Sequence, residues 1–296
     1  MKSIFFSRFA QDLSLKAWEM LPAQHDALVR ELAALDFGDL EARLAGLELS
    51  GKPEGYPYAG EVEVSPDGAI AVMNVSGPLY SNVPDWAKAM FGVADLQDIN
   101  HDVEQLSQDS AIETVIYNLD TPGGLAVPSS ETAELIREQG RQKRTVAYSG
   151  PSAMMASAGY KIGAACNEIK AANSADIGCV GTYISITDDS EAYAKEGIKK
   201  HVIRDGKYKA MGLPGKPVTG EELELLEGEV SQLSKNFKSF VRENRPGIAE
   251  TALEGQTLHG TAARNARLID GTRRNLPLVV ADEIRRAAVK KIIKNG

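Results

Sequence analysis

From Gly68 onward, the sequence alternates short apolar runs with segments of helical periodicity, and this alternation restricts the fold more than any other feature. The runs at residues 68–79, 114–124 and 144–150 have strand character, and the segments between them are long enough for helices. Strands separated in this way form right-handed crossovers within a mostly parallel sheet. The sequence therefore predicts an α/β fold with a mostly parallel sheet and crossover helices.

Further elements follow along the chain. Residues 168–172 and 179–187 are strand-like, and residues 129–142 predict a helix capped by Ser129 or Ser130. Thr219, with Glu222 three positions later, is typical of a capping box and predicts a long helix over residues 219–243. We expect four parts: a helical N-terminal extension (1–49) that includes Trp18 on its apolar face, a Gly/Pro-rich linker (50–60), the main domain (61–275) and a helical tail (276–296).

The charge balance and the cysteine content exclude several classes of protein. The chain has 33 Lys and Arg against 41 Asp and Glu, which argues against bulk nucleic-acid binding. Its two cysteines, Cys166 and Cys179, favour two buried thiols in a reducing compartment, without a disulfide framework or a Cys/His metal site. Polar residues interrupt the apolar N-terminal stretch, so we expect no signal peptide and no membrane anchor. No metal or organic cofactor is implied.

Two motifs follow neighbouring predicted strands. "LDTPGG" ends one strand with Gly123 and Gly124, and "SAMMASAGY" places Ser157 at the start of a helix. Active sites of parallel sheets lie at the carboxyl ends of strands, where glycines expose backbone N–H groups and a helix start favours negative charge. Each motif alone is more often structural, with Ser157 as a helix cap and Asp120 fixing the loop backbone. Occurring together, they indicate a nucleophile that faces an oxyanion pocket.

With these motifs the chain resembles the signal peptide peptidase A family of serine peptidases. The resemblance runs from about Gly68 to Gly271, and its motifs are "LDTPGG", "MASAGYKIGAAC", "ANSADIGCVGTYISITD", "VIRDGKYKAMGLPG" and "LHGTAARNARLIDG". The family shares the fold of Clp protease and crotonase, so the resemblance implies a peptidase domain of Clp/crotonase-like fold over residues 61–275.

The resemblance also implies a role for each residue of a Ser-Lys dyad. Ser157 would be the nucleophile, and Lys209 of "DGKYK" would be the general base. Gly123 and Gly124, together with the N–H group of Ala158, would form the oxyanion hole. The sequence departs from the family pattern at Ala158, where glycine is usual, and also at Lys161 and Cys179.

Two other residues compete with Lys209 for the role of base. A lysine base must be neutral, so burial has to lower its pKa from about 10.4. Lys161 lies four positions after Ser157 on the same helix face, although a side chain along its own helix more often points to solvent. His201 borders the segment that leads to Lys209. Lys207 alternates with Lys209 in this strand-like segment, so one of the two faces the pocket.

We expect no membrane anchor but do expect a helical N-terminal extension. In these two respects the chain resembles the head-maturation proteases of tailed phages. Such a protease would act in the host cytoplasm, inside proheads, on scaffold and capsid precursors. Members of this fold assemble into rings, so we expect a homo-oligomer, and a lysine donated across the subunit interface stays open. The alternatives are a cytoplasmic, prophage-encoded bacterial peptidase, a crotonase-type acyl-CoA enzyme and a catalytically silent scaffold. Small and apolar residues at 153–156 predict a narrow apolar pocket for the substrate residue before the cleaved bond.

Overall fold

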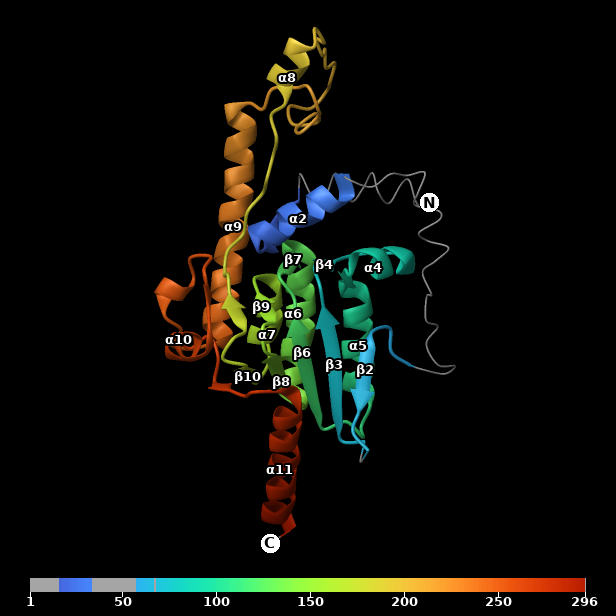
Figure 1. Ribbon diagram of the computed structural model, residues 1–296, viewed down its shortest axis with the longest axis vertical. Coiled ribbons are helices and arrows are strands. Elements are labelled where there is room, and N and C mark those ends of the chain that lie inside the picture. Colours follow the sequence, from blue (N-terminus) through green and yellow to red (C-terminus); the bar gives the residue numbers. More distant parts are fainter. Residues whose placement is uncertain (1–15, 34–56, 67, 296) are drawn as a thin grey trace.

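The computed structural model describes residues 16–33, 57–66 and 68–295 (Figure 1). The expected N-terminal extension lies mainly outside these residues, as does most of the expected linker. Among the described residues, no helix has the length and apolar character needed to cross a membrane.

A six-stranded sheet forms the centre of the molecule, in the order β13-β10-β8-β6-β3-β2. All neighbouring strands in it are parallel except β2, which pairs antiparallel with β3. The expected α/β class with a mostly parallel sheet is confirmed. The strands are β2 (Glu61–Val64), β3 (Ile70–Ser76), β6 (Thr114–Asp120), β8 (Arg144–Ser149), β10 (Glu168–Ala171) and β13 (Gly271–Thr272).

Both faces of this sheet are covered, which explains why β6 is almost continuously apolar. Val115 and Tyr117 of β6 point to the face covered by α5 (Leu96–Gln108) and α6 (Ala126–Gln142). Ile116 points to the other face, where it packs with Val279 of α11 (Leu276–Asn295). The remaining helices are α2 (Pro22–Ala33), α4 (Asp85–Phe91), α7 (Ala158–Ala164), α8 (Ser190–Lys195), α9 (Gly220–Asn244), α10 (Gly260–Asn265) and a 3₁₀ turn (Glu250–Ala252).

Two small sheets carry the two sequence motifs beyond the ends of the central strands. One has the order β1-β7-β4-β5 and the other β12-β11-β9. The strand β7 contains both glycines of "LDTPGG", and β9 ends directly before Ser157. The bounds are β1 (Trp18–Met20), β4 (Leu79–Tyr80), β5 (Ala94–Asp95), β7 (Gly123–Leu125), β9 (Met154–Ala156), β11 (Asp176–Gly178) and β12 (Thr257–Leu258).

The helix starts agree with the sequence in one case and differ in another. The Thr219 hydroxyl accepts from the Glu222 N–H group and the Glu222 carboxylate accepts from the Thr219 N–H group, so the predicted capping box is confirmed. The predicted cap of α6 is wrong. This helix begins at Ala126, directly after β7, and the hydroxyls of Ser129 and Ser130 both donate to the Ala126 carbonyl.

Three further segments differ from expectation. Among the described residues, the strand expected at residues 179–187 is absent, since β11 ends at Gly178 and only Tyr183 forms an isolated bridge, to Trp18. Trp18 lies in a strand and not in the expected helix, because its N–H group and carbonyl oxygen both bond to Tyr183. Residues 188–218, here called the arm, contain α8 and a series of turns instead of the expected strand around Lys209. Asp188 and Asp189 close the base of the arm by accepting from the N–H groups of Val218 and Gly215. In Figure 1 the arm projects beyond the far end of α9, away from the sheets.

Candidate active site

The loop of "LDTPGG" and the loop of Ser157 are joined directly by backbone hydrogen bonds. Thr121 donates to the Met154 carbonyl over 2.7 Å, and its own carbonyl accepts from Ala156 over 3.2 Å. The Asp120 carboxylate accepts from the Met154 N–H group at 3.0 Å, so its expected role in fixing the loop is confirmed. The structure therefore brings the glycine turn and Ser157 together, as the order of the motifs predicts.

Ser157 has the backbone conformation of a strained turn. Its φ is 56° and its ψ is −117°, and its N–H group donates to the Gly178 carbonyl over 2.7 Å. A non-glycine residue in such a conformation costs about 1–3 kcal/mol and persists only where the surroundings impose it. Ser157 occupies the N-cap position of α7, but its side chain makes no cap bond, so capping does not explain its hydroxyl.

The Ser157 hydroxyl is buried next to the Cys179 thiol. Ser157 is 1% exposed, and its hydroxyl oxygen makes no hydrogen bond of normal geometry within the described part of the chain. The thiol of Cys179 lies beside it. Burial raises the pKa of that thiol, and the neighbouring Ser157 hydroxyl counteracts this effect in part. An unpaired buried hydroxyl costs free energy, which a functional role explains.

The glycines at 123 and 124 are required by close approach of other strands. Gly123 has a φ of 106°, and a Cβ atom there would lie 2.0 Å from the carbonyl oxygen of Glu19. A Cβ atom on Gly124 would lie 2.0 Å from the carbonyl oxygen of Leu79. Ala158, the third predicted oxyanion residue, is fully buried at the first position of α7. The strand β7, which holds both glycines, contacts α7, and the glycines also carry a packing role.

Lys209 is not brought to Ser157 within one chain. It lies in a turn of the arm, exposed to solvent, while Ser157 is buried in the body of the molecule. Its backbone N–H group donates to the Gly206 carbonyl, and no described strand pairs with this segment. Lys207, its predicted alternate, forms an ion pair with Glu221 at 2.8 Å.

Lys161 is buried, contrary to the expectation that it points to solvent. Its side chain is 3% exposed and forms an ion pair with Glu19. The Nζ atom also donates to the Ser130 hydroxyl over 2.9 Å and lies 4.5 Å from the centre of the Phe237 ring. Burial lowers the pKa of Lys161, and it raises the pKa of Glu19 to about 7. The ammonium group is therefore engaged by Glu19 and Ser130.

Glu19 is the residue of this region that sequence reasoning missed. It lies far from Lys161 in the chain, and no local pattern links the two. The available signal was a single carboxylate in the apolar run "AWEML". A charge in such a run requires a buried partner, and a lone lysine in an apolar helix supplies one.

The histidine alternative receives no support from the described contacts. His201 is exposed in the arm, and His101 contacts the Pro57 carbonyl. His259 contacts Asp176 and the Ala175 carbonyl, and His25 packs against the rings of Trp18 and Tyr183. Within the described ranges, no cluster of His, Cys, Asp and Glu has the grouping of a metal site.

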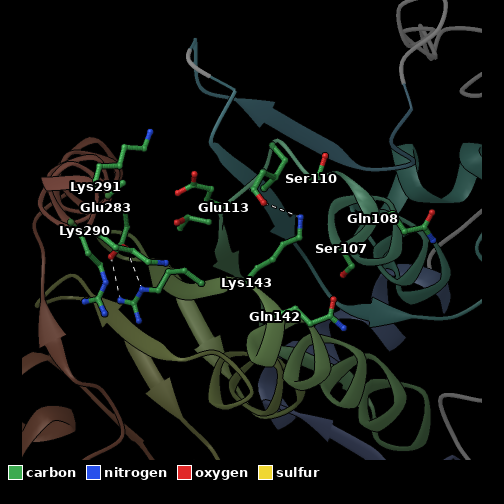
Figure 2. A pocket seen from close by; sticks show the side chains of 14 residues that line it. Ser107, Gln108, Ser110, Glu113, Gln142, Lys143, Glu283, Lys290 and Lys291 are labelled. Carbon is green, nitrogen blue, oxygen red and sulfur yellow. Dashed lines mark hydrogen bonds and ion pairs between the residues drawn. The ribbon is translucent and has the colours of Figure 1, made fainter. Parts of the chain in front are cut away.

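Hollows on the surface lie at both ends of the sheet. One of about 830 Å³ lies at the starts of β6 and β8, near Lys143, Glu283 and Lys290 (Figure 2). Ser157 lies beyond the opposite, carboxyl ends of the strands, so this hollow is separate from the candidate site. A smaller hollow of about 290 Å³ is lined by Met20, Cys179 and Tyr183, and Ser157 is not among its lining residues.

Residues 137–282 match peptidase family S49, described as "Peptidase family S49". This segment, just under half of the chain, is similar to the family. It includes Ser157 and Lys209, and it confirms the resemblance that the motifs indicated.

Individual proteins are also similar to this chain. The chain is 27% identical over 171 residues to a putative protease of Methanocaldococcus jannaschii, covering 57% of this chain and 54% of the relative. It is 25% identical over 198 residues to capsid assembly protease C of Escherichia phage lambda, covering 67% and 44%. The chain thus spans about half the length of the curated relatives it matches. Among solved structures, a ClpP1 mutant from Listeria monocytogenes is 11% identical with a TM-score of 0.42, covering 69% of this chain and 91% of that chain.

Proposed function

We propose that this chain is a serine endopeptidase in which Ser157 is the nucleophile and Lys209 the general base. The N–H groups of Gly123, Gly124 and Ala158 would stabilise the oxyanion of the tetrahedral intermediate. The observation that carries the proposal is the buried, unpaired hydroxyl of Ser157 on a strained turn beside the glycine loop. Neutral Lys209 would take the hydroxyl proton and return it to the leaving amine.

The exposed position of Lys209 supports a site that is shared between subunits. The arm extends away from the body that holds Ser157, and its base is closed by Asp188 and Asp189. In a homo-oligomeric ring, repeated head-to-tail contacts bring an extended arm of one subunit onto the body of the next. Docking there would bury Lys209 and favour its neutral form.

The substrates we propose are peptides or unfolded proteins, in particular scaffold or capsid precursors during phage head maturation. The support is the similarity to capsid assembly protease C of phage lambda. The buried apolar residues Met155 and Ala156 before the nucleophile are consistent with a narrow apolar pocket for the substrate residue before the cleaved bond.

The test compares cleavage of an unfolded protein by the full chain and by Ser157→Ala, Lys209→Ala and Lys207→Ala, with products identified by mass spectrometry. Lys207 lies in the same turn of the arm and is exposed, so it is the matched control for Lys209. We expect the first two variants to lose at least about 1,000-fold in rate while folded, on the order seen for nucleophile and base removal. We expect Lys207→Ala to remain active. Normal cleavage by folded Lys209→Ala would contradict the dyad.

A further inference from the structure

The strand β1 lies in a groove that an external strand fits. On one side it pairs antiparallel with β7, with Glu19 opposite Gly124 and Met20 opposite Gly123. On the other side Trp18 exchanges two hydrogen bonds with Tyr183, at 2.8 and 3.0 Å. The strand thus has backbone partners on both edges, which is how an extended peptide is held when it adds to a sheet.

We propose that Trp18–Met20 occupy, within the same chain, the place of a substrate peptide, so that this segment holds the peptidase closed. The inference rests on the proposed function and extends it to regulation and to the substrate. It follows from the position of β1 on the two glycines of the candidate oxyanion hole. The carbonyl oxygen of Glu19 lies so close to Gly123 that a Cβ atom there would be 2.0 Å away. A peptide approaching Ser157 along β7 therefore meets β1 first.

The side chains of β1 define what this groove accepts. Trp18 and Met20 point to one face, where they are 0% and 1% exposed in an apolar cluster. Glu19 points to the other face and pairs with Lys161, one turn after Ser157 on α7. A peptide that binds in the place of β1 would therefore be extended, with large apolar side chains on either side of a carboxylate. Lys161 would then determine specificity, by binding the carboxylate of the peptide that displaces Glu19.

The attachment of β1 is of a kind that can be reversed. The strand has three residues, and among the described residues its only bridge on the side away from β7 is that of Trp18 to Tyr183. In the helix that follows, α2, the described side chains that are buried are His25 and Leu28, and most of the others are exposed. A buried ion pair adds little net stability, since desolvation offsets much of the attraction, so a peptide with its own carboxylate can replace Glu19 on similar terms.

A reversible cross-link between β1 and β7 tests the proposal in the full chain. Backbone hydrogen bonds run from Leu21 to Pro122 and from Ala126 to Ala17 at the two ends of the ladder. In an antiparallel ladder, hydrogen-bonded and non-hydrogen-bonded pairs alternate. Trp18 and Leu125 are therefore a non-hydrogen-bonded pair. Side chains of such pairs are close enough for a disulfide. We expect Trp18→Cys/Leu125→Cys to cleave a peptide when reduced, to lose at least tenfold in rate when oxidised, and to recover with reductant.

Trp18→Cys alone, treated with the same oxidant, is the matched control for oxidation of Cys179 beside Ser157. Equal cleavage by the oxidised and reduced double variant would overturn the proposal and leave the peptidase function standing, since a fixed β1 would not then obstruct the substrate.

Hydrogen exchange in Ser157→Ala provides a readout that needs neither catalysis nor the double variant. We expect an unfolded peptide with the apolar–acidic–apolar pattern to increase amide exchange at residues 16–21. The same peptide with lysine in place of the acidic residue should increase exchange much less. Unchanged exchange at saturating peptide would overturn the proposal. Increased exchange, combined with no cleavage by wild type or by the reduced double variant, would support displacement of β1 by the peptide. It would at the same time contradict the peptidase function.

Discussion

At the scale of single residues, the conformation of Ser157 is the feature that a purely structural serine does not explain. Its positive φ stores strain that glycine would relieve. We predict that Ser157→Gly has a free energy of unfolding about 1 kcal/mol higher than that of Ser157→Ala. Urea denaturation of the two variants measures this difference. Equal stability of the two variants would show that the turn is unstrained.

The Glu19–Lys161 pair gives a second prediction at this scale. Lys161→Met leaves a carboxylate buried without its partner, and we expect it to lower the free energy of unfolding by roughly 3–5 kcal/mol. Glu19→Gln/Lys161→Met removes both charges and should cost clearly less. A double-mutant cycle from urea denaturation checks this. Additive losses in the double variant would mean that the two side chains do not interact.

The same pair makes stability depend on pH. Burial raises the pKa of Glu19 from its ordinary 4.5 to about 7, so the folded protein binds a proton more tightly than the unfolded chain does. The resulting stabilisation is fully present below pH 4.5 and is lost as the pH rises through 7. We therefore expect the difference in Tm between wild type and Glu19→Gln to change between about pH 4.5 and 7. A constant difference would contradict the raised pKa.

At the scale of elements, the start of α9 is fixed by Glu222. Burial opposes its ionisation, but hydrogen bonds from Lys216 and from the Thr219 N–H group outweigh this and lower the pKa of Glu222 to about 2. Its stabilising effect is present above pH 4.5 and is lost as the pH falls through 2. We predict that Glu222→Gln lowers the Tm at about pH 7, and that the difference from wild type shrinks toward pH 2. Thermal unfolding followed by circular dichroism across this range measures the trend.

Elements whose signal is local could be predicted from the sequence. The apolar run of β6 and the capping box of α9 are contained in a few neighbouring residues, and both are confirmed. The strand at Trp18 could not, because it exists only through bonds to Tyr183 and β7, which lie far away in the chain. The segment around Lys209 alternates like a strand, but no described strand lies beside it to pair. Strand formation depends on such distant partners more than helix formation does.

At the scale of the whole molecule, the sequence located one half of the candidate site better than the other. The meeting of "LDTPGG" with the Ser157 loop could be predicted, because both follow neighbouring parallel strands whose carboxyl ends share an edge. The separation of Lys209 could not, since the direction of the arm depends on long α9 and on the closure at Asp188 and Asp189. The Glu19–Lys161 pair could not be predicted either, because the two residues are far apart in the sequence and become partners only when the folded protein buries both.

Mixing Ser157→Ala with Lys209→Ala tests most directly whether Ser157 of one subunit and Lys209 of another form one peptidase site. Ser157→Ala and Lys209→Ala are unfolded together and refolded at equal concentrations, and cleavage is compared with each variant refolded alone. The account predicts that each is inactive alone and that the mixture recovers about a quarter of the wild-type rate, since random head-to-tail neighbours form an intact pair at that frequency. Wild type taken through the same unfolding and refolding is the control. If wild type regains full activity but the mixture is as inactive as each variant alone, the shared site is contradicted.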